Sequence, residues 1–330
     1  MSDLKILIIG ELNQNNELIP VTLQLTSKMS ELVKDIPEAK IQVLVTGQRM
    51  SYDLIIEELA KTGADEVIIT NDDILKDYNV TRYSKVVTEI VRKENPDILL
   101  FGATHIGREL APVVTTELET GLTADCTGLD LVDNRLSATR PTYGGKLNAA
   151  IFCKTFPQAA TVRPNVFKIN ELPEPKEINV KFDWIDTSDA EVKTEILEVI
   201  NETVNNNLEN AQIVVSGGRG MKSKEGFFLL GELAACLGGV VGASRAAVDS
   251  GLMPQSAQVG QTGQTVSAKL YIACGISGAS QHIAGINSCD KIIAINTDKD
   301  APIFKYADYG IVGDAFEIIP KLISELIKIK

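Results

Sequence analysis

The sequence AQIVVSGGRG at residues 211–220 decides the fold of the C-terminal part of this 330-residue chain. A β-branched apolar run ends at Ser216, and three of the next four residues are glycine. Apolar residues at helical spacing then continue to about Leu237, so the segment predicts a strand, a glycine turn and a helix. In a parallel sheet such turns lie at the carboxyl ends of the strands, where α/β domains bind their ligands.

Further strands and helices follow this turn in alternation. Short apolar runs predict strands at residues 240–242, 270–275, 291–296 and 309–312. A helix that begins at Ala315 closes the chain. A series of strands joined by helices predicts a doubly wound α/β domain built on a parallel sheet.

The first half of the chain has the same rhythm and predicts a second parallel-sheet α/β domain. Buried strands are expected at residues 5–9, 42–46, 66–70 and 97–101. Amphipathic segments at 53–61 and 81–93 lie between them and predict helices that cover both faces of the sheet. Between residues 122 and 167, polar and apolar residues alternate, with turn residues at 133–134 and 144–145. This pattern predicts added antiparallel strands that complete the sheet.

Residues 170–210 differ in composition from both halves. Pro173 and Pro175 stand among alternating glutamates and lysines, and residues 205–207 are three consecutive asparagines. Such a segment is a poor core, so we expect an exposed connection with one acidic helix inside it. The predicted domains are therefore residues 1–204, which include the linker, and residues 205–330.

Charge and cysteine usage exclude several classes of protein. The chain has 44 acidic and 32 basic side chains and a net charge of −12, which argues against nucleic acid or an anionic membrane as a main partner. No apolar run approaches the roughly 18 residues that cross a bilayer. Five scattered cysteines without a C-x-x-C motif indicate free thiols in a reducing cytoplasm, and two histidines are too few for a histidine-rich metal site.

The generic nucleotide and hydrolase motifs fail on inspection. The turn that begins at Gly218 has Ser223 where the dinucleotide fingerprint needs its third glycine, and it does not fit a P-loop. Residues 275–279 resemble a nucleophile elbow but end in Ala279 instead of glycine. A serine hydrolase and a stand-alone NAD-dependent dehydrogenase are therefore disfavoured. Small and hydrogen-bonding residues at several strand ends still fit a phosphate-containing ligand.

A family resemblance makes this expectation specific. The C-terminal part resembles the FAD domain of electron-transfer flavoprotein alpha subunits, the FixB family. Seven segments carry the resemblance in unbroken order, at residues 215–220, 241–249, 258–263, 275–282, 294–296, 301–304 and 307–314. Residues 122–126 and 160–164 are also similar to the family.

The resemblance implies a role for residues around the flavin ring. Ser244 and Arg245 are expected to approach the isoalloxazine, with the Arg245 guanidinium over the ring. Gln261 and Thr262 are expected to line the flavin edge, beside Val259 and Gly260, with the Thr262 hydroxyl near N5.

Other residues are implied to hold the rest of FAD. Arg219 is expected near the pyrophosphate and ribityl groups. The resemblance implies that one segment surrounds the ribityl and phosphate groups: Ser277, Gly278, Ala279, Ser280, Gln281 and His282. His282 is also expected to donate a hydrogen bond to flavin O2. Asn296, Asp314 and Ala315 are expected at the adenosine end. Lys222 and Lys224 are expected to be solvated surface residues.

The predicted charges have a clear physical use. One-electron transfer requires a stable half-reduced flavin, whose anionic form carries charge near N1 and O2. A cation over the ring and an N–H donor at O2 favour that anion. A unit charge about 4 Å away is worth about 4 kcal/mol at an effective dielectric near 20, or about 170 mV for one electron.

The resemblance also implies partners. Alpha chains of this family carry FAD, pair with a beta subunit, and pass electrons from a flavin dehydrogenase to a second redox partner. An acyl-CoA dehydrogenase of fatty acid β-oxidation is one such dehydrogenase. The beta subunit holds either AMP or a second FAD. The chain would then be an electron-transport subunit, with no nucleic acid or membrane insertion.

One stretch bears on the choice between AMP and a second FAD. Residues 139–147 resemble alpha subunits from anaerobic bacteria, in which a second FAD takes electrons from NADH and splits them between ferredoxin and another acceptor. Two alternatives stay open: a non-bifurcating flavoprotein with one FAD plus AMP, and a nucleotide-binding protein without a redox role. The same features fit an electron carrier and a subunit of a bifurcating oxidoreductase.

Overall fold

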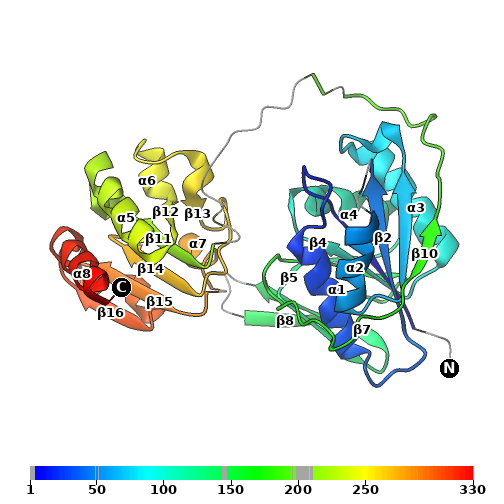
Figure 1. The fold of residues 1–330 in the computed structure, drawn as a ribbon, viewed down its shortest axis with the longest axis horizontal. Helices are drawn as coiled ribbons and strands as arrows, with labels where there is room; N and C mark the ends of the chain where they lie inside the picture. The colour runs from blue at the N-terminus through cyan, green and yellow to red at the C-terminus, as the bar shows by residue number, and fades with distance from the viewer. Residues whose placement is uncertain are drawn as a thin grey trace. The chain divides into compact units, whose positions relative to one another are not determined.

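The computed structural model describes residues 4–48, 50, 52–142, 147–194, 196–197, 208, 211–287 and 289–329. The chain forms two compact units, Met1–Val199 and Ile200–Lys330 (Figure 1). Each unit has a parallel sheet with helices, which confirms the predicted fold class. Residue 205, where the sequence places the boundary, lies outside the described residues.

A seven-stranded parallel sheet forms the centre of the first unit. Its strand order is β10-β3-β2-β1-β4-β9-β5. The strands are β1 (Lys5–Gly10), β2 (Lys40–Gly47), β3 (Glu66–Asn71), β4 (Ile98–Gly102), β5 (Leu122–Cys126), β9 (Gln158–Val162) and β10 (Asn179–Phe182). The four strands predicted from the apolar runs are the central ones, because they are buried on both faces.

Four helices cover the two faces of this sheet (Figure 1). They are α1 (Pro20–Leu32), α2 (Tyr52–Thr62), α3 (Val80–Glu94) and α4 (His105–Glu117). Successive side chains of a strand point to opposite faces, so Ile6 and Ile8 join the core under α1 and α2. Leu7 and Ile9 join the core under α3 and α4. The first unit is therefore a three-layer α/β sandwich.

A buried carboxyl group lies where β1 ends. Glu11 accepts a hydrogen bond of 2.6 Å from the Thr104 hydroxyl, which in turn accepts one from Gly107 N and so caps α4. Burial raises the pKa of Glu11 to about 7, against the lowering effect of the Thr104 hydrogen bond. Glu11 is thus close to its titration point at neutral pH.

The antiparallel strands form a sheet of their own. Strands β6 (Gly128–Val132), β7 (Arg135–Thr142) and β8 (Leu147–Phe152) pair in that order, whereas β5 and β9 extend the main sheet in parallel. The prediction that antiparallel strands complete the main sheet was wrong, because the local alternation does not show which strands will pair. The turn predicted at 133–134 joins β6 to β7, and the one at 144–145 lies outside the described residues.

The segment predicted as a linker contributes a strand to the first unit. Strand β10 pairs in parallel with β3, with Val180 opposite Val67. Among the described residues of 170–210, no helix is present, so the expected acidic helix is not found there. The reason is tertiary pairing, which gives a short polar stretch a partner that its own sequence does not reveal.

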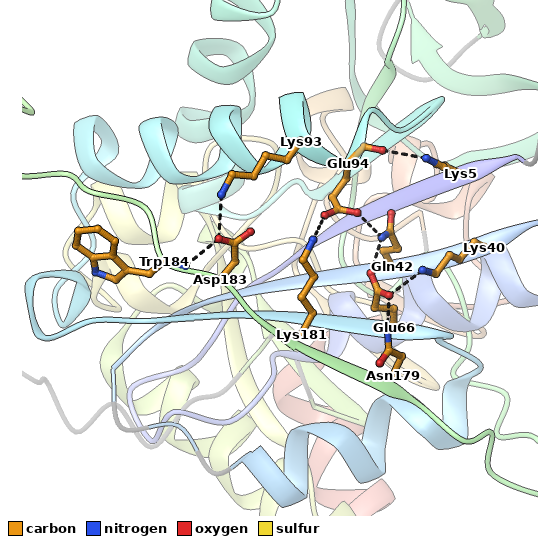
Figure 2. Close-up of polar contacts among 10 residues, drawn as sticks. All are labelled: Lys5, Lys40, Gln42, Glu66, Lys93, Glu94, Asn179, Lys181, Asp183 and Trp184. Carbon is orange, nitrogen blue, oxygen red and sulfur yellow. Dashed lines mark hydrogen bonds and ion pairs between the residues drawn. The ribbon is translucent and has the colours of Figure 1, made fainter.

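Side chains fasten β10 to the strands and helix beside it (Figure 2). Gln42 Nε2 donates to Glu66 Oε1 at 2.7 Å and to Glu94 Oε2 at 2.9 Å. From β10, Asn179 Nδ2 donates to Glu66 Oε2 at 2.7 Å, and Lys181 pairs with Glu94. The carboxylates of Glu66 and Glu94 therefore each bind one side chain of β10 and also Gln42 of β2.

The second unit has a six-stranded parallel sheet in the order β13-β12-β11-β14-β15-β16. Its strands are β11 (Ile213–Gly217), β12 (Val240–Ser244), β13 (Gln258–Val259), β14 (Leu270–Cys274), β15 (Ile292–Asn296) and β16 (Tyr309–Val312). The first strand is central, and the chain winds outward from it in one direction and then in the other. This is the doubly wound order.

Helices cover both faces of this second sheet. Helices α5 (Lys224–Leu237) and α8 (Ala315–Ile329) pack on one face, and α7 (Ser280–Ile283) on the other. Ser223 caps the start of α5 by accepting from Gly226 N, and Gly238 ends it in the left-handed conformation. None of the described helices combines the length and apolarity that a membrane span requires.

Candidate functional site

A cavity of about 720 Å³ lies at the carboxyl ends of the strands of the second sheet. It sits beside β11 and β14, between which the winding reverses, and open α/β sheets bind ligands at such a point. The residues that line it are Gly218, Arg219, Gly220, Lys222, Ser244, Arg245, Ala246, Asp249, Gln258, Val259, Gly260, Gln261, Thr262, Gly275, Ile276, Ser277, Gly278, Ala279, Gln281, His282, Asn296, Asp298 and Ala301.

Two glycine turns approach each other closely on the cavity wall. A Cβ atom on Gly218 would lie 2.0 Å from the Gly275 carbonyl oxygen, and one on Gly220 would lie 2.8 Å from it. Gly220 N donates to that same oxygen at 3.2 Å. The turns after β11 and β14 therefore require glycine because their backbones touch.

A third glycine holds the next part of the wall. Gly278 has φ +88°, and a Cβ there would lie 2.4 Å from Ile303 N. Ile303 N donates to the Ser277 carbonyl at 3.0 Å, which brings the 3₁₀ helix Pro302–Lys305 against this turn. The segment is thus shaped by a backbone conformation that a side chain would prevent.

Charged side chains give the cavity a cationic excess. Arg219, Lys222 and Arg245 line it, against Asp249 and Asp298. This local excess stands out in a chain of net charge −12. An anionic group such as a pyrophosphate fits it electrostatically.

One of these cations was missed by the sequence analysis. Lys222 is exposed, as predicted, and it also lines the cavity, a position that the sequence analysis did not give it. Its backbone has φ +62°, and its ammonium group lies 5.7 Å from the centre of the Phe316 ring. The rare left-handed conformation turns the chain from the 3₁₀ helix Arg219–Met221 into α5. Lys224, within α5, is not a lining residue.

The short helix α6 (Arg245–Asp249) carries two charges into the cavity wall. Ser244 ends β12 and precedes the helix directly. Arg245 Nε lies 3.5 Å from Asp249 Oδ2, and both side chains are more than 60% exposed, at 68% and 63%. The predicted ring-facing cation therefore has a carboxylate partner, which the sequence analysis did not identify.

The loop after β13 is held by amide groups. Gln258 Nε2 donates to the Thr262 hydroxyl at 3.1 Å, and Gln261 N donates to the Gln281 carbonyl at 2.8 Å. Gly260 has φ +140°, and a Cβ there would meet the Gln281 carbonyl at 3.0 Å. The predicted residues of the segments 258–263 and 275–282, except Ser280, therefore line the cavity together.

His282 lies in this wall but not as a free donor. The residue is 6% exposed, its Nδ1 lies 3.1 Å from the Val259 carbonyl, and its Nε2 lies 3.0 Å from the Tyr271 hydroxyl. Burial lowers the pKa of His282 to about 4, so the ring is neutral. Both ring nitrogens contact protein atoms, and the expected hydrogen bond from His282 to flavin O2 stays a prediction.

Three predicted residues are not among those that line the cavity. Ser280 is the exposed first residue of α7. Asp314 accepts from Phe316 N at 2.9 Å and so starts α8, and Ala315 is buried in the core at 7% exposure. Asn296, by contrast, does line it, and its side chain donates to the Ile276 carbonyl at 2.9 Å.

The remaining missed residues lie next to predicted ones. Gly218, Gly220, Ala246, Gln258, Gly275, Ile276, Asp298 and Ala301 all line the cavity. Most stand inside the seven segments that carry the family resemblance. The family resemblance could therefore have identified these residues. Asp298 lies two residues after the segment 294–296, and no feature of the sequence marked it as a lining residue.

Comparison with known proteins agrees with this geometry. The family described as Electron transfer flavoprotein domain matches residues 6–182, and the Electron transfer flavoprotein FAD-binding domain matches residues 207–287. The chain belongs to the electron transfer flavoprotein alpha-subunit family. This assignment confirms the resemblance that the seven segments indicated, and it makes the chain a member of a flavin-binding family.

Named relatives of the family match along nearly the whole chain. The chain is 45% identical to an electron transfer flavoprotein subunit alpha of Thermoanaerobacterium thermosaccharolyticum, over 100% of both chains. It is 46% identical to Protein FixB of Clostridium saccharobutylicum, over 94% of this chain and 93% of the relative. It is 40% identical to an acryloyl-CoA reductase electron transfer subunit beta of Anaerotignum propionicum, over 95% and 93%.

Proposed function

We propose that this chain is an electron-carrying subunit that binds one FAD in the cavity of its second unit. The observation that carries the proposal is the cavity itself, at the switch point of a doubly wound sheet. Its wall contains all the predicted cofactor residues except Ser280, Asp314 and Ala315. These three stay predictions for the adenosine end and the phosphate wrap.

The side chains of the wall suit the parts of FAD. The turns at Gly218, Gly220 and Gly278 line the cavity, and backbone N–H groups of such glycine turns can bind a pyrophosphate, while Arg219 and Lys222 supply the opposite charge. Arg245 is the cation proposed to face the flavin ring. When bound, FAD supplies reversible uptake of one or two electrons, while the chain supplies binding, orientation and electrostatics.

We propose a beta subunit as the obligate partner and a flavin dehydrogenase as the electron donor. The name of the Anaerotignum relative, an electron transfer subunit of an acryloyl-CoA reductase, supports a partner that acts on acyl-CoA substrates. All five cysteines are free, which supports a reducing cytoplasm as the location.

The similarity of residues 139–147 to anaerobic bacterial alpha subunits favours a second FAD on the beta subunit, with NADH and ferredoxin as partners. Residues 143–146 of that stretch lie outside the described residues. Flavin counting tests this finer proposal. Two FAD per purified heterodimer support bifurcation, and one FAD plus AMP contradicts it.

The main proposal is tested by cofactor uptake. The chain is purified with its beta subunit, stripped of cofactor, and titrated with FAD under absorbance and fluorescence detection. We expect a tight FAD site on this chain, in addition to the second FAD site that the beta subunit carries if the complex bifurcates electrons. A colourless complex that takes up no FAD contradicts the proposal, and a bound FAD that cannot be reduced contradicts the electron-carrier role.

A further inference from the structure

The buried amide of Gln258 defines the role of the Thr262 hydroxyl in the cavity wall. Gln258 stands in β13 and is 3% exposed, and its Nε2 donates to Thr262 Oγ1 at 3.1 Å. A carboxamide nitrogen can only donate, so the hydroxyl oxygen is the acceptor of this bond. The single hydrogen of the hydroxyl therefore stays free for another partner.

The cavity is where this hydrogen can find its partner. Thr262 lines the cavity and is exposed, and none of the residues that the structure describes accepts a hydrogen bond from its hydroxyl. A donor in the wall must meet an acceptor atom on a ligand, since two facing donors leave both unsatisfied. The wall at Thr262 thus favours a carbonyl oxygen or an unprotonated ring nitrogen and disfavours an N–H group.

The backbone around Gln258 leaves its side chain little freedom. Gln264 N donates to the Gln258 carbonyl at 2.7 Å, so the loop after β13 folds back on the residue. A Cβ atom on Gly263 would lie 2.9 Å from Gln258 Cγ and 2.3 Å from the Gln258 carbonyl oxygen. The loop can pass this close because residue 263 is glycine. The chain therefore builds a confined place for an amide beside Thr262.

We propose that Gln258 is a positioning residue, which holds the Thr262 hydroxyl as a hydrogen-bond donor to a ligand in the cavity. The hydrogen bond that the hydroxyl accepts also polarises it, so it becomes a stronger donor. Oxidised flavin has ring acceptors at N1, N5, O2 and O4 and a ring donor at N3. Gln258 thus admits one of these acceptors at Thr262 and excludes the N3–H group. The part of this inference that concerns FAD rests on the proposed function.

The bond between the two side chains is measurable without FAD. In the FAD-free heterodimer with ¹³C,¹⁵N-labelled glutamine, the side-chain NH₂ signals of Gln258 are assigned through its backbone. Thr262→Val removes the hydroxyl, whereas Thr262→Ser keeps it. We expect the Gln258 signals to shift in Thr262→Val and to stay near their wild-type positions in Thr262→Ser. Signals that do not respond to Thr262→Val show that the amide does not donate to Thr262 and overturn the inference.

The positioning role is tested with bound FAD whose ring carries ¹³C and ¹⁵N. Thr262→Val identifies the ring atom that accepts from the hydroxyl, because its signal shifts when the donor is lost. Gln258→Met removes the amide, and we expect it to shift the same signal in the same direction by a smaller amount. Gln255→Met, on the exposed start of the 3₁₀ helix Gln255–Ala257 and outside the cavity wall, is the matched control and should leave that signal unchanged.

A double-mutant cycle separates positioning from a structural effect. In the Thr262→Val background, Gln258→Met has no hydroxyl to act through, so we expect no further shift of the ring signal. FAD affinity should fall by less than about tenfold in Gln258→Met, since one hydrogen bond between protein groups is lost. An equal shift in both backgrounds, or no shift in the background with Thr262, overturns the positioning role.

The outcomes also separate this inference from the proposed function. Failure of the wild-type complex to bind FAD removes the proposed function, while the Gln258 signals still decide whether its amide holds the Thr262 hydroxyl. With FAD bound, a response of the N3 signal to Thr262→Val, instead of a response at an acceptor atom, contradicts the donor role. If Gln258→Met does not fold, the comparison of wild type with Thr262→Ser and Thr262→Val decides.

Discussion

Arg245 and Asp249 form an ion pair along α6, with 3.5 Å between Arg245 Nε and Asp249 Oδ2, and both side chains line the cavity. The cation proposed to face the flavin is therefore partly neutralised by its own helix. Both side chains are largely exposed, so water screens their charges as well. The full effect of about 4 kcal/mol expected for an isolated charge near 4 Å is an upper limit here.

Arg245→Ala and Asp249→Asn are expected to act with opposite signs. Loss of the cation destabilises the singly reduced, anionic flavin, so the first one-electron potential falls. Loss of the carboxylate removes the partner of Arg245, so that potential rises. In a water-like dielectric we expect about 40 mV for each variant, measured by potentiometric titration. Shifts of the same sign in both variants would falsify the charge argument.

Lys222 is expected to contribute to phosphate binding, although its neighbour Lys224 does not. Lys222→Met removes a cation from the cavity wall and should weaken FAD binding about tenfold at low salt. The difference from wild type should shrink as salt rises, because exposed charges are screened. Lys224→Met is the control, since Lys224 is exposed and absent from the wall. Equal affinities in the two variants, measured by FAD titration, contradict a role for Lys222.

Gly278 is expected to tolerate no side chain. In Gly278→Ala the new Cβ meets Ile303 N at 2.4 Å in a backbone with φ +88°, so we expect about 3 kcal/mol of destabilisation and loss of FAD binding. Gly231→Ala in α5 is the matched control, because nothing lies within 4 Å of its Cβ. It should raise the free energy of unfolding by about 0.5–1 kcal/mol. Urea denaturation measures both, and a stable, FAD-binding Gly278→Ala protein disproves the packing argument.

Glu11 is expected to make the first unit less stable as pH rises. Its folded pKa, about 7, lies above the ordinary glutamate value of 4.5, so the folded state holds the proton more tightly than the unfolded state. The raised pKa of Glu11 contributes about 3 kcal/mol to the free energy of unfolding. This contribution is fully present below about pH 4.5 and is lost as the pH rises through about 7. Glu11→Gln should remove this slope.

The comparison uses urea denaturation of both proteins at about pH 5 and about pH 8. Glu38→Gln, on an exposed turn, should keep the wild-type slope. Parallel pH profiles for wild type and Glu11→Gln would show that Glu11 has no raised pKa.

Most of the fold could be predicted because its strands are encoded locally. The runs around Ile8, Val43, Ile68 and Leu100 are apolar on both faces, and such short apolar runs are typical of buried parallel strands. Strand β10 could not be predicted this way, since Lys181 and Asn179 are polar. They form a strand because Glu94 and Glu66, about 90 to 110 residues earlier, hold them.

The candidate site was predictable in composition and less so in its hydrogen bonds. The glycines, hydroxyls and arginines around residue 219 and residues 275–282 stand in recognisable segments. The state of His282 depends on its burial and on its contacts with the Val259 carbonyl and the Tyr271 hydroxyl, neither of which the sequence marks as a partner. Arg245 and Asp249 form an ion pair because they stand four residues apart on a helix. The pair could be predicted only if α6 were already known to be a helix.

Strand β10 determines where the chain can be divided. A fragment that stops at residue 170 loses Lys181 and Asn179, leaves Glu66 and Glu94 without these partners, and uncovers the edge of β3. An open edge of unpaired backbone groups is a template for aggregation. A fragment that continues to Thr194 keeps β10 and the hydrogen bond from Asn79 to Thr194. The smallest piece of the first unit that can be expressed alone therefore includes most of the segment whose composition suggests a linker.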